Sequence, residues 1–423
     1  MRFDTLPEWL AWQENLHFTE VDPGLDRIGL VWQRLDYAKT LPYKIVTVAG
    51  TNGKGSSVAM LDAIIRAADY KVGTYTSPHL LNYNERIVIG GQACDDMAIC
   101  RAFEQIDQAR ADVSLTYFEF ATLAAIILFL EQDVDIALLE VGMGGRLDAV
   151  NLFDADIALI TPISLDHTQW LGVDRETIAY EKAGVIRENK PVVCSESKAA
   201  TSLLAYADKL NAPVFRSGHQ FRYQLEGNNW SWSNAEYDWA GLVLPALAGD
   251  YQVQNAAAVL QVVSLLIGQN FKIEQFHVHR GLSTVRLAGR FQEVTGPLVN
   301  HYLDVTHNVQ GAKNLEKLLY SKECMGKTVA VLGMLKDKDA AAVAEILGQQ
   351  IDVWYVGGIM GNRGLTGDNL SSEIERSVLT KPVYAHETIS MAYEQANKAV
   401  KQGDRIIVFG SFYTVEVVMR LLG

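Results

Sequence analysis

The stretch Thr47-Val-Ala-Gly-Thr-Asn-Gly-Lys-Gly-Ser-Ser57 decides the fold of this chain of 423 residues. It follows a β-branched run at residues 44–48 and opens a helical pattern at residues 58–68. Nucleotide phosphates are held in many proteins by these parts: a strand, a glycine-rich turn, and a helix start with lysine and hydroxyl side chains. The stretch therefore predicts a phosphate-binding loop in an α/β domain.

The turn supplies four residues that we expect to hold ATP. Gly53 and Gly55 let backbone N–H groups approach the phosphates, while Lys54 neutralises them and Ser56 reaches a magnesium ion. The spacing departs from the usual phosphate-loop pattern, because Gly50 lies only three residues before Gly53. A bare glycine-rich turn is often only a turn, but the lysine and serine that follow favour phosphate binding.

Composition limits the classes of partner. Lys and Arg total 37 against 50 Asp and Glu, a formal charge of −13, which argues against a nucleic-acid or anionic-membrane surface. The four cysteines lack C-x-x-C spacing and indicate reduced thiols. No apolar signal segment begins the chain, and the longest apolar run, residues 120–130, is too short to span a bilayer. We expect a cytoplasmic monomer that binds no nucleic acid and no membrane, with a buried helix at 120–130.

Strands alternate with helices along most of the chain, which predicts mainly parallel sheets with helices on both faces. Residues 5–38 have helical spacing, residues 215–244 resemble a small antiparallel β meander covered by three tryptophans, and a helix is expected at 254–267. The irregular segment 286–290 is a candidate hinge. The predicted strands are 44–48, 72–75, 136–141, 157–163 and 191–194, then 298–305, 328–332, 353–356, 382–384 and 405–409.

Polar residues that follow these strands are candidate metal ligands. Glu140 ends a buried strand beside the phosphate loop, where a magnesium-binding carboxylate is expected, although a helix-capping acid is the alternative. Ser77 adds an oxygen ligand. His167 lies at the same sheet edge; because Mg²⁺ prefers oxygen, a site with histidine also suits Mn²⁺. Lys182 lies on a predicted helix, and a lysine there is most often on the surface. The adjacent charges of Glu85 and Arg86 could by themselves form only a surface ion pair.

Together these segments resemble the folylpolyglutamate synthase/dihydrofolate synthase family, within the wider Mur-ligase group of ATP-dependent amide-forming enzymes. The resemblance extends in order over nearly the whole chain, and it carries two departures, Thr306 for alanine and Ala288 for proline. The chain before residue 47 is too short for the nucleotide-sugar domain of peptidoglycan Mur ligases. The matching segments are residues 50–56, 77–80, 85–87, 140–151, 166–172, 181–186, 304–308, 333–339 and 410–414.

The resemblance implies a P-loop ATPase domain at residues 1–287 and a Rossmann-like C-terminal domain at 288–423 that closes over the site. It also implies two magnesium ions, one held by Ser77 and Glu140, the other by His167 and a carbamylated Lys182. The residues expected to contact ATP beyond the phosphate loop are Asn255, Arg290 and Asp304.

Three segments resemble those that line the dihydropteroate pocket in bifunctional bacterial members of the family. Phe118 would stack on the flat ring of the pterin, and a core phenylalanine that caps the following helix is an equal alternative. We expect both dihydrofolate and polyglutamate synthesis, with a monofunctional polyglutamate synthase as the alternative. The predicted pocket residues are Val21, Asp22, Pro23, Gly24, Thr116, Tyr117, Phe118, Glu119, Leu147, Asp148 and Ala149.

The expected reaction has two steps, because a carboxylate is a poor electrophile until ATP activates it. A carboxylate of dihydropteroate or a reduced folate takes the γ-phosphoryl group, and the L-glutamate amine then displaces phosphate. Lys54 and the metal ions neutralise charge. His307 is the candidate that binds or activates glutamate, with a scaffold role equally open, and Ser411 is a weaker candidate. The rival interpretations are a P-loop kinase and a nucleotide-dependent switch protein.

Overall fold

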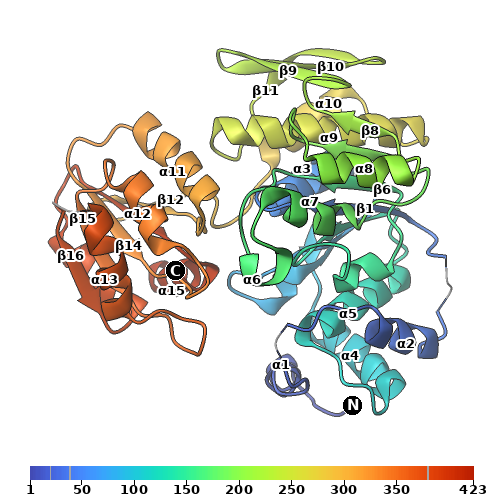
Figure 1. Ribbon diagram of the computed structural model, residues 1–423, viewed down its shortest axis with the longest axis horizontal. Coiled ribbons are helices and arrows are strands. Elements are labelled where there is room, and N and C mark those ends of the chain that lie inside the picture. Colours follow the sequence, from blue (N-terminus) through green and yellow to red (C-terminus); the bar gives the residue numbers. More distant parts are fainter. Residues whose placement is uncertain (20, 38–39, 379–380) are drawn as a thin grey trace. The chain divides into compact units, whose positions relative to one another are not determined.

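The computed structural model describes residues 1–19, 21–37, 40–378 and 381–423, which form two compact units. Unit 1 comprises residues 1–79, 83–246 and 252–285, and unit 2 comprises 80–82, 247–251 and 286–423. The two short stretches group with unit 2 because Leu80 lies in one of its hydrophobic cores and Tyr251 packs against another. The predicted domain boundary after residue 287 divides the chain once, so it does not include the two short stretches that unit 2 takes from earlier in the sequence. Figure 1 colours the chain from blue to red along its length.

Unit 1 is built on an eight-stranded sheet in the order β4-β3-β2-β5-β1-β6-β7-β8. All neighbours from β2 to β8 pair in parallel, which was predicted for every strand except β8, because the expected meander began at residue 215. The short β3 and β4 pair antiparallel, and their apolar runs are too short to predict strands. The strands are β1 (Lys44–Ala49), β2 (Val72–Tyr75), β3 (Ile87–Ile89), β4 (Gln92–Ala93), β5 (Ile136–Glu140), β6 (Ile157–Ile160), β7 (Val192–Cys194) and β8 (Val214–Arg216).

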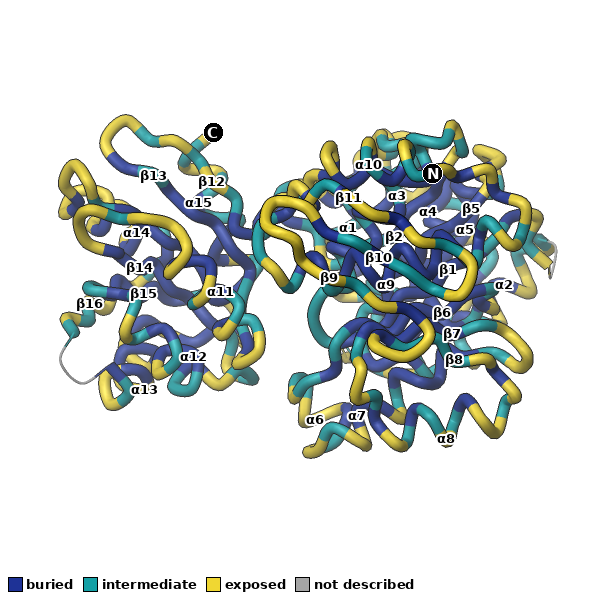
Figure 2. The backbone as a smooth tube through the Cα atoms, turned by 90° about the horizontal axis from the view of Figure 1, so that it is seen from above, coloured by how far each residue is buried: buried dark blue, intermediate teal, exposed yellow. Residues whose placement is uncertain are grey.

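Helices cover this sheet, and its central strands are buried (Figure 2). The predicted apolar run forms α5, which is hydrophobic all round and therefore lies inside the core. The helices are α1 (Leu6–Gln13), α2 (Asp26–Arg34), α3 (Lys54–Ala67), α4 (Asp96–Arg110), α5 (Tyr117–Glu131), α6 (Thr168–Leu171), α7 (Arg175–Ala183), α8 (Thr201–Lys209), α9 (Asp250–Gly268) and α10 (Gln275–Thr284).

The expected helix over residues 5–38 is wrong in its middle. The chain is helical only in α1 and α2, and the described residues between them include Pro23 and Gly24, which disfavour a continuous helix. Residues 20, 38 and 39 of that range lie outside the described part of the chain. The break frees the segment that contains Asp22 to turn toward α5.

The antiparallel meander is confirmed as the three-stranded sheet of β9 (Phe221–Glu226), β10 (Asn229–Asn234) and β11 (Asp238–Val243). Trp230, Trp232 and Trp239 are buried, so they serve this sheet as core residues. The Nε1–H of Trp232 donates to the carbonyl oxygen of Ala257 at 2.9 Å, which fixes the sheet on α9.

Unit 2 is a second α/β layer structure with strand order β12-β13-β17-β14-β15-β16. The sheet is parallel except for β12, an edge strand that the sequence did not indicate. Its elements are β12 (Gln292–Thr295), β13 (Asn300–Leu303), α11 (Val309–Ser321), β14 (Thr328–Leu332), α12 (Ala340–Leu347), β15 (Val353–Gly357), α13 (Gly367–Val378), β16 (Val383–His386), α14 (Ile389–Ala399), β17 (Arg405–Phe409) and α15 (Phe412–Leu422).

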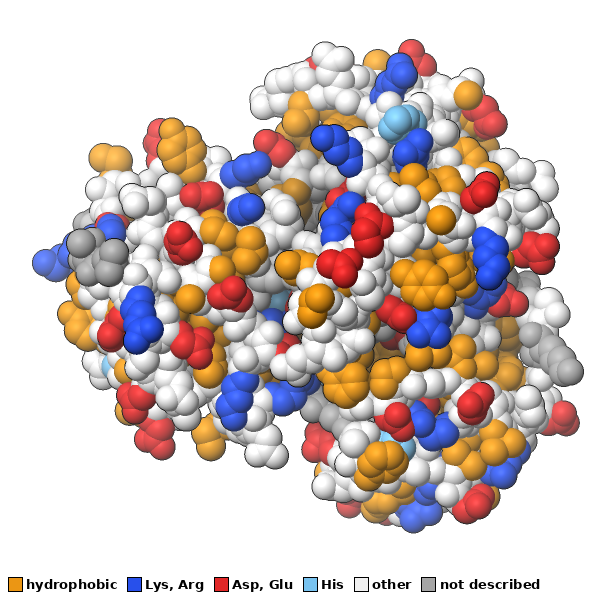
Figure 3. Space-filling model, in the orientation of Figure 1, with side chains coloured by type: hydrophobic (Ala, Val, Ile, Leu, Met, Phe, Trp, Pro, Cys, Tyr) orange, Lys and Arg blue, Asp and Glu red, His pale blue; other side chains and the backbone are white. Residues whose placement is uncertain are grey.

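The surface charge and the hydrophobicity of the helices bear on which classes of partner the protein could bind. Acidic and basic side chains are interspersed on the face shown in Figure 3. Within the described ranges, α9 is the one helix long and apolar enough to cross a membrane, and 72% of its apolar window is buried inside the protein. Its apolar side chains are therefore core residues of unit 1.

The crossing of α10 over α3 supplies a stability prediction. A methyl group at Gly281 would lie 2.6 Å from the Cα atom of Ile64, so the two helices would have to separate. Alanine normally favours a helix over glycine by about 1 kcal/mol, but we expect Gly281→Ala to lower the free energy of unfolding by about 1–3 kcal/mol. Denaturant unfolding measures the change.

The matched control is Gly268→Ala at the end of α9, where the added methyl group meets nothing within 4 Å. This variant should be neutral or slightly stabilised. Equal behaviour of the two alanine variants would contradict the role of close packing at Gly281.

Candidate functional site

The phosphate loop lies between β1 and α3. The helix begins at Lys54, four residues earlier than its apolar pattern indicated, and Gly53 precedes it with φ at 92°. The N–H groups of Lys54, Gly55 and Ser56 therefore lie in the first helical turn, whose N–H groups have no partner inside the helix. Such a turn is suited to an anion.

The following strand end holds the loop in place. The N–H groups of Thr51 and Asn52 donate to the carbonyl oxygen of Pro162 at 2.9 and 3.3 Å. The Nζ atom of Lys54 lies over its own loop and donates to the carbonyl oxygens of Gly50 and Thr51 at 3.2 and 3.3 Å. Lys54 therefore lies at the loop where phosphate oxygens are expected to bind.

Lys182 reaches the same loop from α7. It is 4% exposed, and its Nζ atom donates to the carbonyl oxygen of Gly50 at 2.9 Å, so two lysines meet at one carbonyl. Burial, together with the nearby charge of Lys54, lowers the pKa of Lys182 to about 7. The alternative of an ordinary surface lysine is wrong.

The other predicted metal ligands follow neighbouring strands. Ser77 follows β2 and Glu140 ends β5, and the N–H of Ser77 donates to Oε2 of Glu140 at 3.3 Å. His167 follows β6 and directly precedes α6 at a positive φ of 49°. The carboxylate of Asp166 acts on the pKa of Lys182, so this turn also lies near the lysine.

These donors fit magnesium in number, and Ser77 and Glu140 also fit it in chemistry. Among the described residues no three His, Cys, Asp or Glu side chains form one metal-binding cluster. Magnesium keeps water and phosphate oxygens as ligands and needs only one or two protein groups per ion. Ser77 and Glu140 supply oxygen donors of this kind, whereas His167 supplies nitrogen and Lys182 supplies oxygen only as a carbamate, so both sets remain predictions.

Two of the three predicted pocket segments are joined by an ion-pair network. Asp22 accepts a hydrogen bond from the Arg27 guanidinium at 2.6 Å, and Arg27 also donates to Glu119 at 3.2 Å. The ring of His17 contacts Asp22 at 3.1 Å. The sequence interpretation missed Arg27 and His17, although both lie five residues from Asp22.

The third predicted pocket segment, which contains Asp148, is linked to Phe118 through the turn at residues 142 and 143. A methyl group at Gly142 would lie 2.7 Å from the Phe118 ring, which is only partly buried. The backbone N–H groups of Met143 and Val150 donate to the Asp148 carboxylate at 2.9 and 3.0 Å. Burial raises the pKa of Asp148 to about 6, while these N–H groups and Lys54 oppose the rise. The partial exposure of Phe118 favours the pocket interpretation over a purely core one.

The environment of Arg86 differs from the surface ion pair that the sequence suggested. Arg86 is buried rather than part of a surface ion pair, its Nε–H donates to Nδ1 of His79 at 2.8 Å, and its guanidinium lies 5.5 Å from the Tyr117 ring centre. The sequence offered only the adjacent charges of Glu85 and Arg86. Arg86 therefore belongs with the pocket segment that contains Tyr117.

The predicted residues of unit 2 gather at the carboxyl ends of β13 and β17. Asp304 accepts hydrogen bonds from the N–H groups of Phe291 and Thr306 at 2.8 Å each, and Nδ1 of His307 lies 2.8 Å from the Val305 carbonyl oxygen. Ser411 caps α15. The Arg290 guanidinium lies 5.4 Å from the Phe412 ring centre. Backbone bonds to Asp304 hold the turn at Thr306, the position of one departure from the family pattern.

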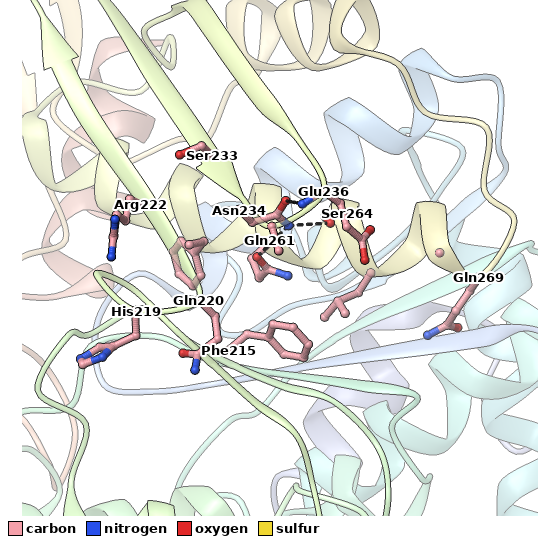
Figure 4. A pocket seen from close by; sticks show the side chains of 14 residues that line it. Phe215, His219, Gln220, Arg222, Ser233, Asn234, Glu236, Gln261, Ser264 and Gln269 are labelled. Carbon is pink, nitrogen blue, oxygen red and sulfur yellow. Dashed lines mark hydrogen bonds between the residues drawn. The ribbon is translucent and has the colours of Figure 1, made fainter.

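A cavity of about 610 Å³ lies elsewhere in unit 1, between β9, β10 and the second half of α9 (Figure 4). None of its lining residues is a predicted site residue. Asn234 donates to Ser264 at 2.9 Å and to Gln261 at 3.3 Å across its wall. These polar groups join the small sheet to α9.

Gly53 supplies a prediction for nucleotide binding. A methyl group there would lie 2.6 Å from Oδ1 of Asn255, at a φ of 92° that side chains rarely adopt. We expect Gly53→Ala to weaken ADP binding about tenfold or more, measured by calorimetric titration. Gly227→Ala is the control, because it has a φ of 65° with open space around it. An equal loss in both variants would contradict a specific role for Gly53.

Comparison with known proteins gives consistent matches over the whole chain. Residues 48–263 match the Mur ligase middle domain, and residues 289–412 match the Mur ligase glutamate ligase domain. The dihydrofolate synthase/folylpolyglutamate synthase of Escherichia coli (strain K12) is 38% identical over 418 residues, which cover 99% of this chain and 95% of the relative.

Solved structures agree with these matches. The structure of E. coli FolC in complex with DHPP and ADP is 38% identical, with a TM-score of 0.91 over 99% of this chain and 98% of that chain. A bifunctional folylpolyglutamate synthase/dihydrofolate synthase with Mn, AMPPNP and L-glutamate bound is 39% identical, with a TM-score of 0.89 over 99% and 98% of the two chains.

Proposed function

This chain belongs to the Mur ligase family, within its dihydrofolate synthase/folylpolyglutamate synthase group, and we propose that it joins L-glutamate to 7,8-dihydropteroate and to reduced folates. It is an ATP-dependent ligase that works with a divalent metal ion. The observation that carries the proposal is the meeting of Lys54 and Lys182 at the Gly50 carbonyl, beside a helix start suited to phosphate.

In the first proposed step, the acceptor carboxylate attacks the γ-phosphorus of ATP, which gives an acyl phosphate and ADP. Lys54 and the first-turn N–H groups hold and neutralise the phosphates. Asn255 of unit 1, with Arg290 and Asp304 of unit 2, are the further proposed ATP contacts. Magnesium, with Mn²⁺ tolerated, would be held by Ser77 and Glu140 at one site and supplies positive charge to the phosphates.

The second proposed metal site needs Lys182 in a changed form. The neutral amine of Lys182 attacks CO₂ and loses a proton, and the resulting carbamate is an anionic oxygen ligand beside His167. Burial at 4% exposure and a pKa of about 7 support this reaction, because much of the amine is then neutral at physiological pH. A crystallographic density map of the purified enzyme distinguishes the carbamate from the amine.

The acceptor is proposed to bind where the three segments of unit 1 meet. Phe118 stacks on the pterin ring, and Asp148, which has a raised pKa, contacts its polar edge. Val21 to Gly24 and Thr116 to Glu119 form the wall that Arg27 braces. Leu147 and Ala149 complete the proposed pocket.

In the second step, the amine of L-glutamate attacks the acyl carbon and phosphate leaves. We assign His307 to binding or activation of glutamate, with Ser411 as a further contact, because the N–H of Gly410 donates to the Thr306 carbonyl oxygen at 2.8 Å and so joins the two segments. The bond at Nδ1 of His307 to the Val305 carbonyl orients the ring for such a role. The enzyme is proposed to act as a cytoplasmic monomer without nucleic-acid or membrane partners.

The proposal is tested by phosphate release with Mg-ATP and L-glutamate, comparing 7,8-dihydropteroate with a tetrahydrofolate. Turnover of both acceptors, with products confirmed by mass, is the expected result. Turnover of tetrahydrofolate alone would leave a monofunctional polyglutamate synthase and contradict the pterin pocket. ADP release with an acceptor but no need for glutamate would indicate a kinase instead.

A further inference from the structure

Three buried polar side chains connect the phosphate loop to α9. Nε2 of Gln252 donates to Oγ of Ser56 at 3.2 Å, and Oε1 of Gln252 accepts from Nδ2 of Asn255 at 3.0 Å. Gln252 is 0% exposed, and its two partners are exposed by only 2% and 3%. A buried amide with both ends bonded orients the groups at its two ends.

We infer that Gln252 is a positioning residue that couples the metal-facing hydroxyl of Ser56 to the nucleotide-facing amide of Asn255. The inference rests on the proposed function, which assigns Asn255 to ATP, and on the expectation from the sequence that the Ser56 hydroxyl reaches a magnesium ion. In this proposal Gln252 contacts neither ATP nor the metal ion. The sequence pattern did not indicate a role for Gln252.

The coupling follows from the direction of the hydrogen bonds. In the structure, Ser56 accepts from Gln252, so one lone pair of its oxygen is occupied. A cation at Ser56 is bound better when the hydroxyl donates instead and both lone pairs face outward. That reversal requires the Gln252 amide to turn by 180°, which presents its NH₂ group to Asn255.

Asn255 must then turn as well, because two NH₂ groups cannot bond to each other. In the structure, Oδ1 is the Asn255 atom nearest to Gly53, at 2.6 Å from an added methyl group against 3.0 Å for Nδ2. After reversal, the Asn255 NH₂ group faces that side and can donate to a nucleotide oxygen or ring nitrogen. A metal ion at Ser56 thereby favours the donor form of Asn255.

The test measures ADP affinity by calorimetric titration, with and without Mg²⁺, so it needs neither folate nor glutamate. Gln252→Met should weaken ADP binding in the presence of Mg²⁺ about tenfold. Gln254→Met is the matched control, because Gln254 lies on the same helix and its side chain donates instead to the Ser195 carbonyl at 3.1 Å. The control should bind ADP as wild type does, and an equal loss in both variants would overturn the inference.

A double-mutant cycle separates positioning from a general structural role. If Gln252 acts through Asn255, adding Gln252→Met to Asn255→Ala should change ADP affinity by less than about twofold. Full additivity of the two losses would overturn the coupling. Thermal unfolding of each variant checks that the fold is retained.

Gln252→Glu provides a second variant of nearly the same shape. A carboxylate only accepts, so it cannot reverse between Ser56 and Asn255. The gain in ADP affinity that Mg²⁺ brings should shrink about fivefold in this variant, and an unchanged gain would overturn the inference. If wild type binds ADP but ligates no folate, the proposed function fails while this result still decides the role of Gln252.

Discussion

Lys54→Ala is expected to slow acyl-phosphate formation by about 10³-fold, because it removes the cation at the phosphate loop. The side chain lies over the carbonyl oxygens of Gly50 and Thr51, at the place where the triphosphate is expected. Positional isotope exchange in ATP, measured with acceptor but without glutamate, reports this step. Lys44→Ala at the other end of β1 is the control, since its ammonium group pairs with Asp156 at 3.4 Å, away from the phosphate loop.

The same exchange measurement separates the two halves of the proposed mechanism. His307→Ala should retain exchange and lose amide formation, because His307 is assigned to glutamate. Loss of exchange in the His307 variant would refute that assignment. Retention of exchange by Lys54→Ala would refute the role of the phosphate loop.

Lys182→Met is expected to lower ligation by about 10²-fold or more, because a methionine cannot form the carbamate ligand. The same variant should be more stable than wild type at neutral pH by about 1–4 kcal/mol, since it removes a buried, poorly paired amine. Both changes are expected if the buried Lys182 amine lowers the free energy of unfolding and its carbamate supports ligation. Activity and denaturant unfolding, the latter in CO₂-free buffer, measure them.

The stability difference should depend on pH. Burial lowers the pKa of Lys182 from 10.5 to about 7, so between these values the unfolded chain binds a proton that the folded chain does not. Wild-type stability therefore rises as the pH rises through this window. The advantage of Lys182→Met should be largest below pH 7 and should shrink toward pH 10. A difference that does not change with pH would contradict the perturbed amine.

Local patterns were sufficient to predict β1, the glycine-rich turn that follows it and the mainly parallel pairing of the sheet. The β-branched strand and the glycine-rich turn act over a few residues, and the apolar α5 is recognisable by composition alone. The early start of α3 was missed, because its first turn is polar and its stability comes from the loop around it. The strand β3 and the edge strands β4, β8 and β12 were missed because they are short.

The site was less predictable where it depends on contacts between distant residues. The bond from Gln252 to Ser56 joins positions 196 residues apart, and Arg27 reaches Glu119 across 92 residues. Neither pair has a sequence spacing that marks it. The burial of Lys182 and Arg86 has the same origin, since Lys182 contacts Gly50 and Arg86 contacts Tyr117, both distant in the sequence. Spacing motifs located the groups, and the tertiary fold determined their environment.

The position of β17 in unit 2 has a consequence for synthesis of the chain. Residues Arg405–Phe409 pair with β13 on one side and β14 on the other, so the sheet is joined through a strand close to the C-terminus. Until the ribosome has released those residues, β13 and β14 have no strand between them. Unit 2 should therefore complete its folding only after β17 has left the ribosome, and a premature stop before residue 405 should leave a product for proteolysis.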